Sequence, residues 1–226
     1  MAPERRPFNL LMLAAGSSTR MGSPKHLLPY ADGRPSYQNQ LEMLHEAFPD
    51  TQNTYLFLRE PSQQAAIQNL PSLRIQLIFE TSLITDKFPD KDAALGSVAG
   101  LLAAFQRDPI SDWLIMPCDY PLMTIKEVRR LRAQYRDPVT CFENGRGLLE
   151  PYAAIWGPDA LARLAENVAQ GFGNPRKVIE ELQGTRVRPL YDHSLFNTNT
   201  KEDWEDAMRL LVGRKDDGDL SNDKEV

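Results

Sequence analysis

The apolar stretch that sets the architecture lies near the amino terminus and reads Phe8-Asn9-Leu10-Leu11-Met12-Leu13-Ala14-Ala15-Gly16. Its almost unbroken run of apolar side chains predicts a strand that is buried on both faces, as strands of parallel sheets are. The small residues at its end, closing with Gly16, predict that the strand stops there and gives way to a loop.

Short apolar segments recur downstream and alternate with stretches in which apolar residues lie three and four positions apart, as they do on one face of a helix. Further strands are expected at residues 55–58, 75–79 and 113–116. Helices are expected at residues 37–47, 61–68, 96–106 and 125–135. Ser36 and Thr124 stand where helix N-caps belong. The alternation predicts an α/β fold, a doubly wound, mostly parallel sheet with helices on both faces, whose ligands bind at the carboxyl ends of the strands.

The second half of the chain is less regular. Residues 139–142 and 151–156, joined by a turn at 143–147, predict a hairpin at one edge of the sheet. Helices are again expected at residues 159–169, 176–182 and 201–212. We therefore expect a short extension at residues 1–7, one domain at 8–212, and a disordered polar tail at 213–226, where apolar residues are too few to form a core.

The bulk composition narrows the classes of partner and compartment. A net charge of -5 and a pI near 5.3 argue against non-specific attraction to nucleic acid. Cys118 and Cys141 each lie in an apolar stretch, which argues against a disulfide framework and for a reducing compartment. The apolar run after the first seven residues is too short for a signal peptide or a membrane span. We expect a cytoplasmic protein with neither a nucleic-acid nor a membrane partner.

The loop after the first strand, residues 13–25, carries the first candidate chemistry. Small residues at 14–16 let backbone approach a ligand closely, and exposed N–H groups in such a turn bind anions. Arg20 and Lys25 supply the positive charge that a phosphoryl group under attack requires. The alternative is that the glycines only turn the chain and that both cations are solvated. The loop matches neither the P-loop pattern nor the G-x-G-x-x-G turn of dinucleotide-binding proteins.

A carboxylate stands at the end of another predicted strand. Asp119 follows the strand at 113–116, at the edge of the sheet where ligands of such folds bind. Magnesium is typically held by one or two carboxylates together with substrate phosphates, so this aspartate is a sufficient protein anchor for the ion. The alternative is that Asp119 caps the next helix, but Thr124 is better placed for that role.

Three motifs together resemble one known family. They are L-A-A-G followed by Arg-Met-Gly and Lys at residues 13–25, C-D-x-P at residues 118–121, and F-N-T-N-T at residues 196–200. In this order and spacing they resemble the Rossmann-like nucleotidyltransferases that include the MobA-like molybdenum cofactor guanylyltransferases. The resemblance covers roughly residues 8–212.

The resemblance implies a nucleotide site and a metal site. It implies nucleotide binding by Leu13, Ala14, Ala15, Gly16, Ser17, Arg20, Lys25, Gly96, Ser97 and Asp119. Asp119 would hold Mg²⁺, completed by Asn197 or Asn199. Two alternatives remain open: close helix packing explains Gly96 equally well, and ordinary N-capping of the helix at 201–212 is the alternative role for Asn199 or Thr200.

On the acceptor side, the resemblance points to Pro151, Tyr152, Arg176 and Lys177. The basic pair would meet the phosphate of the acceptor. The alternative for Arg176 and Lys177 is an ordinary solvated helix start.

The functional hypothesis is a magnesium-dependent nucleotidyltransferase with Arg20, Lys25 and Asp119 as catalytic residues. An ionised acceptor phosphate attacks the α-phosphorus of a nucleoside triphosphate, and pyrophosphate leaves. The resemblance implies GTP and a molybdopterin-type acceptor. Because L-A-A-G replaces the L-A-G-G usual in guanylyltransferases, CTP remains open as donor, with that cofactor or a sugar or other small-molecule phosphate as acceptor. A non-catalytic nucleotide-binding module is the alternative from another class, and the joint presence of Lys25 and Asp119 argues against it.

Overall fold

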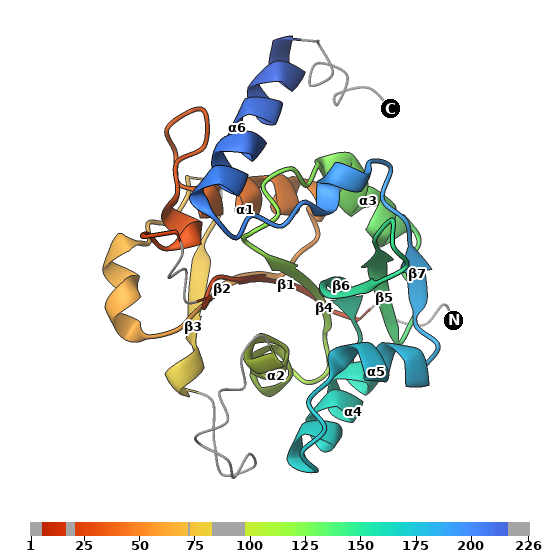
Figure 1. Cartoon of the computed structure of the whole chain (residues 1–226). Helices are drawn as coiled ribbons and strands as arrows, with labels where there is room; N and C mark the ends of the chain where they lie inside the picture. Colours follow the sequence, from red (N-terminus) through yellow and green to blue (C-terminus); the bar gives the residue numbers. More distant parts are fainter. Residues whose placement is uncertain (1–5, 17–20, 72, 83–97, 217–226) are drawn as a thin grey trace.

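A seven-stranded sheet forms the centre of the protein (Figure 1). The computed structural model describes residues 6–16, 21–71, 73–82 and 98–216. The strands are β1 (Phe8–Leu13), β2 (Asn53–Leu58), β3 (Ile75–Phe79), β4 (Asp112–Pro117), β5 (Val139–Glu143), β6 (Leu149–Trp156) and β7 (Thr185–Val187). The α-helices are α1 (Ser36–Ala47), α2 (Val98–Arg107), α3 (Ile125–Ala133), α4 (Pro158–Ala169), α5 (Pro175–Glu181) and α6 (Lys201–Asp216).

The strands lie in the order β3-β2-β1-β4-β6-β5-β7. β1 pairs in parallel with both β2 and β4, and β2 pairs in parallel with β3. β6 pairs antiparallel with β4 and with β5, and β5 is parallel to β7, so among these seven strands β6 alone runs in the reverse direction. The amino end of β6 therefore lies at the same edge of the sheet as the carboxyl ends of the other strands.

Both faces of the sheet are covered, as the run at residues 8–16 predicts. Leu10 and Met12 of β1 pack into one core and Leu11 packs into the other, because successive side chains of a strand point to opposite faces. In Figure 1, α1 and α3 cover the first face and α2, α4 and α5 cover the second. The predicted α/β class, with a mostly parallel sheet between two helical layers, is confirmed.

The predicted hairpin forms, but it does not lie at the edge of the sheet. β7 pairs with the outer side of β5, from Thr140 opposite Thr185 to Phe142 opposite Val187. Residues 185–187 are too few to show a periodic pattern, and Val187 is buried only because the rest of the sheet is assembled beside it.

Three helix predictions differ from the structure in extent or type. Ser36 is the first residue of α1 rather than its cap, because Pro35 directs the chain into the helix and the Ser36 N–H already donates to the Leu28 carbonyl at 2.8 Å. Residues 61–66 form a short 3-10 helix in which no residue is buried, so no apolar face stabilises a longer helix. α6 continues to Asp216, so the segment expected to be a disordered tail begins as helix.

Thr124 is confirmed as the N-cap of α3, since its side chain accepts a hydrogen bond from the Glu127 N–H. The remainder of the predicted tail, residues 217–226, and the extension at 1–5 lie outside the described residues. Within the described part of the chain, the helices are all too short or too polar to cross a membrane.

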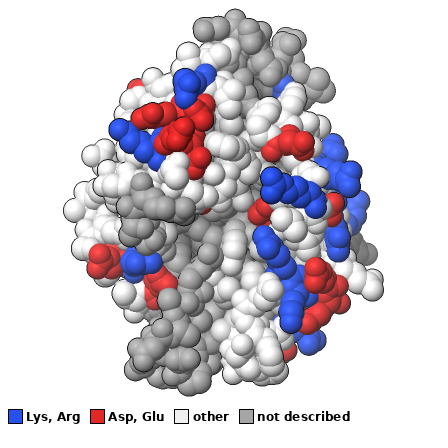
Figure 2. Space-filling model, viewed as in Figure 1, with Lys and Arg blue, Asp and Glu red and all other residues white. Residues whose placement is uncertain are grey.

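Charged side chains on the face seen in Figure 2 are of both signs, with acidic and basic groups next to one another. Some of this mixing reflects ion pairs, such as Arg34 with Asp32 at 2.9 Å and with Glu42 at 2.7 Å.

Candidate active site

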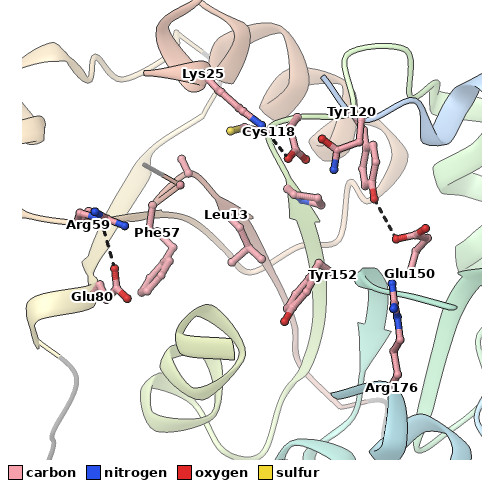
Figure 3. Close-up of a pocket in the computed structure, with 16 residues that line it drawn as sticks. Leu13, Lys25, Phe57, Arg59, Glu80, Cys118, Tyr120, Glu150, Tyr152 and Arg176 are labelled. Carbon is pink, nitrogen blue, oxygen red and sulfur yellow. Dashed lines mark hydrogen bonds and ion pairs between the residues drawn. The ribbon is translucent and has the colours of Figure 1, made fainter. Parts of the chain in front are cut away.

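A cavity of about 510 Å³ opens at the edge of the sheet where β1, β2, β3 and β4 end and β6 begins. Figure 3 shows two walls on either side of Leu13 and Phe57, one carrying Arg59 and Glu80 and the other Tyr120, Glu150 and Arg176. The lining residues are Leu13, Ala14, Ala15, Gly16, Lys25, Phe57, Arg59, Glu80, Pro117, Cys118, Asp119, Tyr120, Glu150, Tyr152, Arg176 and Asn197. The volume is in the range of small-molecule sites.

Lys25 and Asp119, which are 94 residues apart in sequence, meet between the two walls. The Lys25 Nζ lies 3.3 Å from Asp119 Oδ2 and donates a hydrogen bond to Asn199 Oδ1 at 3.0 Å. The side chains of Lys25 and Asp119 are only 14% and 20% exposed. Two oxygens of the predicted metal ligands therefore already converge on one positive charge.

Backbone contacts place Asp119 and the segment that contains Asn199. The Asp119 carbonyl accepts hydrogen bonds from the Thr198 N–H at 2.9 Å and from Thr198 Oγ1 at 3.3 Å. Immediately before Asp119, the Cys118 N–H donates to the Leu13 carbonyl at 3.0 Å. The first loop, the residue after β4 and the segment before α6 are thus tied together at the edge of the sheet.

The start of α6 settles which residue caps that helix. Thr200 Oγ1 accepts from the Asp203 N–H at 3.1 Å, which is the bond of an N-cap, and Asp203 in turn accepts from the N–H groups of Asn199 and Thr200 at 2.8 Å. Capping therefore uses the Thr200 side chain and leaves the Asn199 side chain on Lys25.

The environment of Asp119 suits an additional cation. Burial raises the pKa of its carboxyl above the ordinary value, and the positive charge of Lys25 partly offsets that rise. Asp119 Oδ1 is buried and accepts no hydrogen bond from the described residues. A buried carboxylate oxygen without a donor is costly, and a metal ion or a ligand group that reaches this oxygen would remove the cost.

No three His, Cys, Asp or Glu side chains in the described part of the chain gather into a metal-binding group. The groups gathered at this point are the Asp119 carboxylate and the Asn199 amide oxygen, which are oxygen ligands of the kind Mg²⁺ takes. The residues therefore fit Mg²⁺ if substrate phosphates and water supply its remaining ligands.

Most of the predicted site residues are brought to this cavity. Leu13, Ala14, Ala15, Gly16, Lys25, Asp119, Tyr152, Arg176 and Asn197 line it, and Asn199 contacts Lys25. Ser17, Arg20, Gly96 and Ser97 lie outside the described residues.

Two of the predicted acceptor residues are not among the residues that line the cavity. Pro151 lies between Glu150 and Tyr152 in β6 and is buried, because neighbouring side chains of a strand point to opposite faces. Lys177 is exposed on α5. Arg176 lines the cavity, and its Nε donates to the Leu149 carbonyl at 2.9 Å.

The two glycines of the first loop have different roles. Gly22 has a φ of 70°, a left-handed conformation that favours glycine, so this residue turns the chain. At Gly16 a Cβ would meet no described atom within 4 Å, and the residue lines the cavity. Packing against the described protein therefore does not require a glycine at position 16, whereas close approach of a ligand to its backbone would.

Sequence reasoning missed Arg59, Glu80, Tyr120 and Glu150, which complete the two walls. The signal available for Glu150 was its place two residues before Tyr152 and one residue ahead of the predicted strand at 151–156, since residues two apart in a strand share a face. Arg59 and Glu80 follow β2 and β3, and the rule that sites gather after parallel strands could have identified them.

A family model described as MobA-like NTP transferase domain matches residues 10–187. The chain is 28% identical over 202 residues to the molybdenum cofactor biosynthesis bifunctional protein of Synechocystis sp., covering 88% of this chain and 53% of that protein. It is 25% identical over 208 residues to the probable molybdenum cofactor guanylyltransferase of Bacillus subtilis, covering 86% of this chain and 91% of that one. It thus spans about half the length of the Synechocystis protein.

A solved structure titled as a nucleotidyl transferase from Methanothermobacter thermautotroptrophicus has the same fold, with a TM-score of 0.66 at 16% identity, covering 92% of this chain and 98% of that one. The family model extends from within β1 to the end of β7 and so includes every strand of the sheet. The chain therefore belongs to the MobA-like NTP transferase domain family.

Proposed function

We propose that the protein is a magnesium-dependent nucleotidyltransferase that moves a nucleoside monophosphate from a nucleoside triphosphate to a phosphorylated acceptor. The observation that carries this proposal is the convergence of Asp119 and Asn199 on the Lys25 ammonium at the mouth of the cavity. A site that already gathers oxygens around a positive charge is suited to a metal-bound polyphosphate.

The cavity offers separate places for two reactants. The wall formed by the small residues 14–16 and by Arg59 suits the nucleotide, and the wall formed by Tyr152 and Arg176 suits the acceptor. Lys25 and Asp119 lie between the walls, where the two phosphates would meet. Alignment of two anions is the main task of such an enzyme, since the chemistry needs no protein nucleophile.

The reaction forms one bond and breaks one. An ionised oxygen of the acceptor phosphate bonds to the α-phosphorus, and the bond from that phosphorus to the oxygen bridging to the β-phosphate breaks, so that pyrophosphate leaves. Mg²⁺ held by Asp119, with Asn197 or Asn199, would supply positive charge to the phosphate oxygens. Lys25, and Arg20 in the same loop, neutralise the charge on the departing pyrophosphate.

Lys25 has to change partners during this cycle. Without substrate its ammonium is paired with Asp119. We infer that Lys25 leaves Asp119 and pairs with the phosphates of the triphosphate, which leaves the Asp119 carboxylate available to the ion it would hold.

For the substrates, we propose GTP and a molybdopterin-type acceptor, because the two relatives above are named for molybdenum cofactor biosynthesis and guanylyl transfer. CTP is the second candidate, because Ala15 lines the cavity at the position where L-A-G-G sequences have glycine. With CTP, the acceptor is the same cofactor or a sugar or other small phosphate. We place the reaction in the cytoplasm, where buried free thiols such as Cys118 and Cys141 stay reduced.

The test is pyrophosphate release across the four nucleoside triphosphates and a panel of phosphorylated acceptors, with and without Mg²⁺. Release that needs Mg²⁺, one triphosphate and an acceptor is the expected result. Binding of a nucleoside triphosphate by calorimetry without pyrophosphate release on any acceptor would instead support the non-catalytic nucleotide-binding module.

A further inference from the structure

A carboxylate that the proposed chemistry does not use stands on the acceptor wall of the cavity. Glu150 lies near the amino end of β6, which the reversed direction of that strand brings to the site. Figure 3 shows it between Tyr120 and Arg176, on the wall away from Arg59 and Glu80. A negative charge in a cavity built for polyphosphates opposes binding unless it has a separate partner.

Two neutral donors hold the Glu150 carboxylate in place. Tyr120 donates its hydroxyl to Oε2 at 3.1 Å, and Asn144 Nδ2 donates to Oε1 at 2.9 Å. The orientation of the carboxylate is therefore set before a ligand arrives.

The carboxylate retains capacity for a ligand. An ionised carboxylate offers about four lone-pair sites, and these two donors use one on each oxygen. As far as the described residues go, one further acceptor position remains on each oxygen. A ligand that presents two adjacent N–H or O–H groups matches this pair, as an arginine side chain does in bidentate recognition.

Arg176 beside it gives the wall a defined polarity. The hydrogen bond from Arg176 Nε to the Leu149 carbonyl orients the guanidinium at the residue next to Glu150. A phosphate is attracted to Arg176 and Lys25 and is repelled by Glu150. An acceptor can therefore bind with its phosphate towards Lys25 only if the part that meets Glu150 is a neutral group that donates hydrogen bonds.

We propose that Glu150 is a specificity-determining residue that binds a pair of adjacent hydrogen-bond donors on the acceptor. Such pairs occur in the N–H edge of an aminopyrimidinone, as in a pterin, and in the vicinal hydroxyls of a sugar. The proposal rests on the proposed function, which makes this wall the acceptor wall.

The experiment compares the wild type with Glu150→Gln, which keeps the shape of the side chain but removes its charge and one acceptor oxygen. Calorimetry with neopterin monophosphate tests the pterin edge, and mannose 1-phosphate tests the vicinal hydroxyls. Glu150→Gln should lower the affinity for whichever probe binds by about tenfold or more, because a charge-assisted hydrogen bond is lost. The affinity for GTP with Mg²⁺ should stay within about twofold, because Glu150 is on the other wall.

Tyr120→Phe serves as the matched second variant. It removes a donor that orients the carboxylate but leaves the charge, so its loss of probe affinity should be smaller than that of Glu150→Gln. If Glu150 only held the wall together, the two variants would instead lose similar amounts of probe affinity. Their affinity for GTP would fall as well.

Three results would overturn the proposal: unchanged probe affinity in folded Glu150→Gln, an equal loss of GTP affinity, or no binding of either probe to the wild type. Because the readout is binding, it is separable from the proposed function. If the probes bind in a Glu150-dependent way but no acceptor supports pyrophosphate release, the proposed nucleotidyl transfer is wrong. The proposal that Glu150 binds a pair of hydrogen-bond donors would still hold.

Discussion

Replacing Lys25 by Met should raise the affinity of the substrate-free protein for Mn²⁺ and at the same time lower its turnover. In the absence of substrate, the Lys25 ammonium occupies the space between Asp119 Oδ2 and Asn199 Oδ1. A divalent cation that binds there alone has to displace this charge. The methionine keeps most of the apolar stem of the side chain, ends one atom earlier, and removes the competing charge.

The size of the effect follows from the geometry. At the observed 3.3 Å, the Coulomb attraction of Lys25 and Asp119 is about 5 kcal/mol for an effective dielectric constant of roughly 20. Desolvation of the two partly buried groups offsets most of that gain, which leaves a net of about 1–2 kcal/mol. Removing the ammonium should therefore tighten Mn²⁺ binding by about 5- to 30-fold, since each 1.4 kcal/mol is a factor of ten.

The assay is a Mn²⁺ titration followed by electron paramagnetic resonance, without nucleotide and then with the triphosphate that supports turnover. Lys201→Met is the matched control, because Lys201 pairs with Glu205 on the exposed surface of α6. Its Mn²⁺ affinity should equal that of the wild type. In Lys25→Met, pyrophosphate release should fall by about 10²-fold or more, as it does when one group that stabilises a developing charge is lost.

Equal or weaker Mn²⁺ binding in Lys25→Met, with the fold intact, would refute the inference that Lys25 and the metal ion compete for Asp119. Tighter Mn²⁺ binding with full turnover would instead show that Lys25 only blocks the site and does not act on the phosphates.

Three further predictions concern single side chains. Asp119→Asn should lower pyrophosphate release by about 10²- to 10³-fold with an unchanged circular dichroism spectrum, and full activity in the folded variant would remove Asp119 from the mechanism. Burial lowers the pKa of His26 to about 4, so His26 stays neutral in the fold, whereas in the unfolded chain it takes up a proton below its ordinary pKa of 6.5; stability should fall by about 2 kcal/mol between pH 7 and pH 5 from this residue. Urea unfolding at both pH values should show a smaller fall in His26→Gln, and parallel curves would contradict the assignment. The buried Glu127 accepts hydrogen bonds on Oε1 from the Leu190 and Tyr191 N–H groups and from Ser194 Oγ. Glu127→Met removes this acceptor at similar size and leaves the donors unpaired, so it should cost about 2–4 kcal/mol in urea unfolding; a change below about 0.5 kcal/mol, the range of ordinary surface substitutions, would count against that role.

The parts of the fold that sequence predicted are those that depend on local patterns. The sequence predicts a strand buried on both faces at Leu10, Leu11 and Met12, because no polar side chain interrupts them. The structure buries all three completely. Thr124 was predicted as a cap because its side chain needs only the N–H three residues later. Asp119 was placed at the edge of the sheet because it lies two residues after the end of β4.

The features that sequence did not predict depend on partners far along the chain. Which residue of the pair Asn199 and Thr200 caps α6 was open until Asp203 and Lys25 were seen to engage different side chains. Pro151 and Tyr152 were assigned to one wall from a motif, although adjacent strand residues face opposite ways.

Local pattern, then, was enough for the buried strands, the cap of α3 and the residues that follow β1 and β4, because such features need information from a few neighbouring residues. Assembly of the sheet was required to reverse β6, to add β7 outside β5, and to bring Glu150 opposite Arg59 across one cavity. The physical reason is that pairing order and strand direction are set by the total burial of two cores, to which residues far apart in the sequence contribute together.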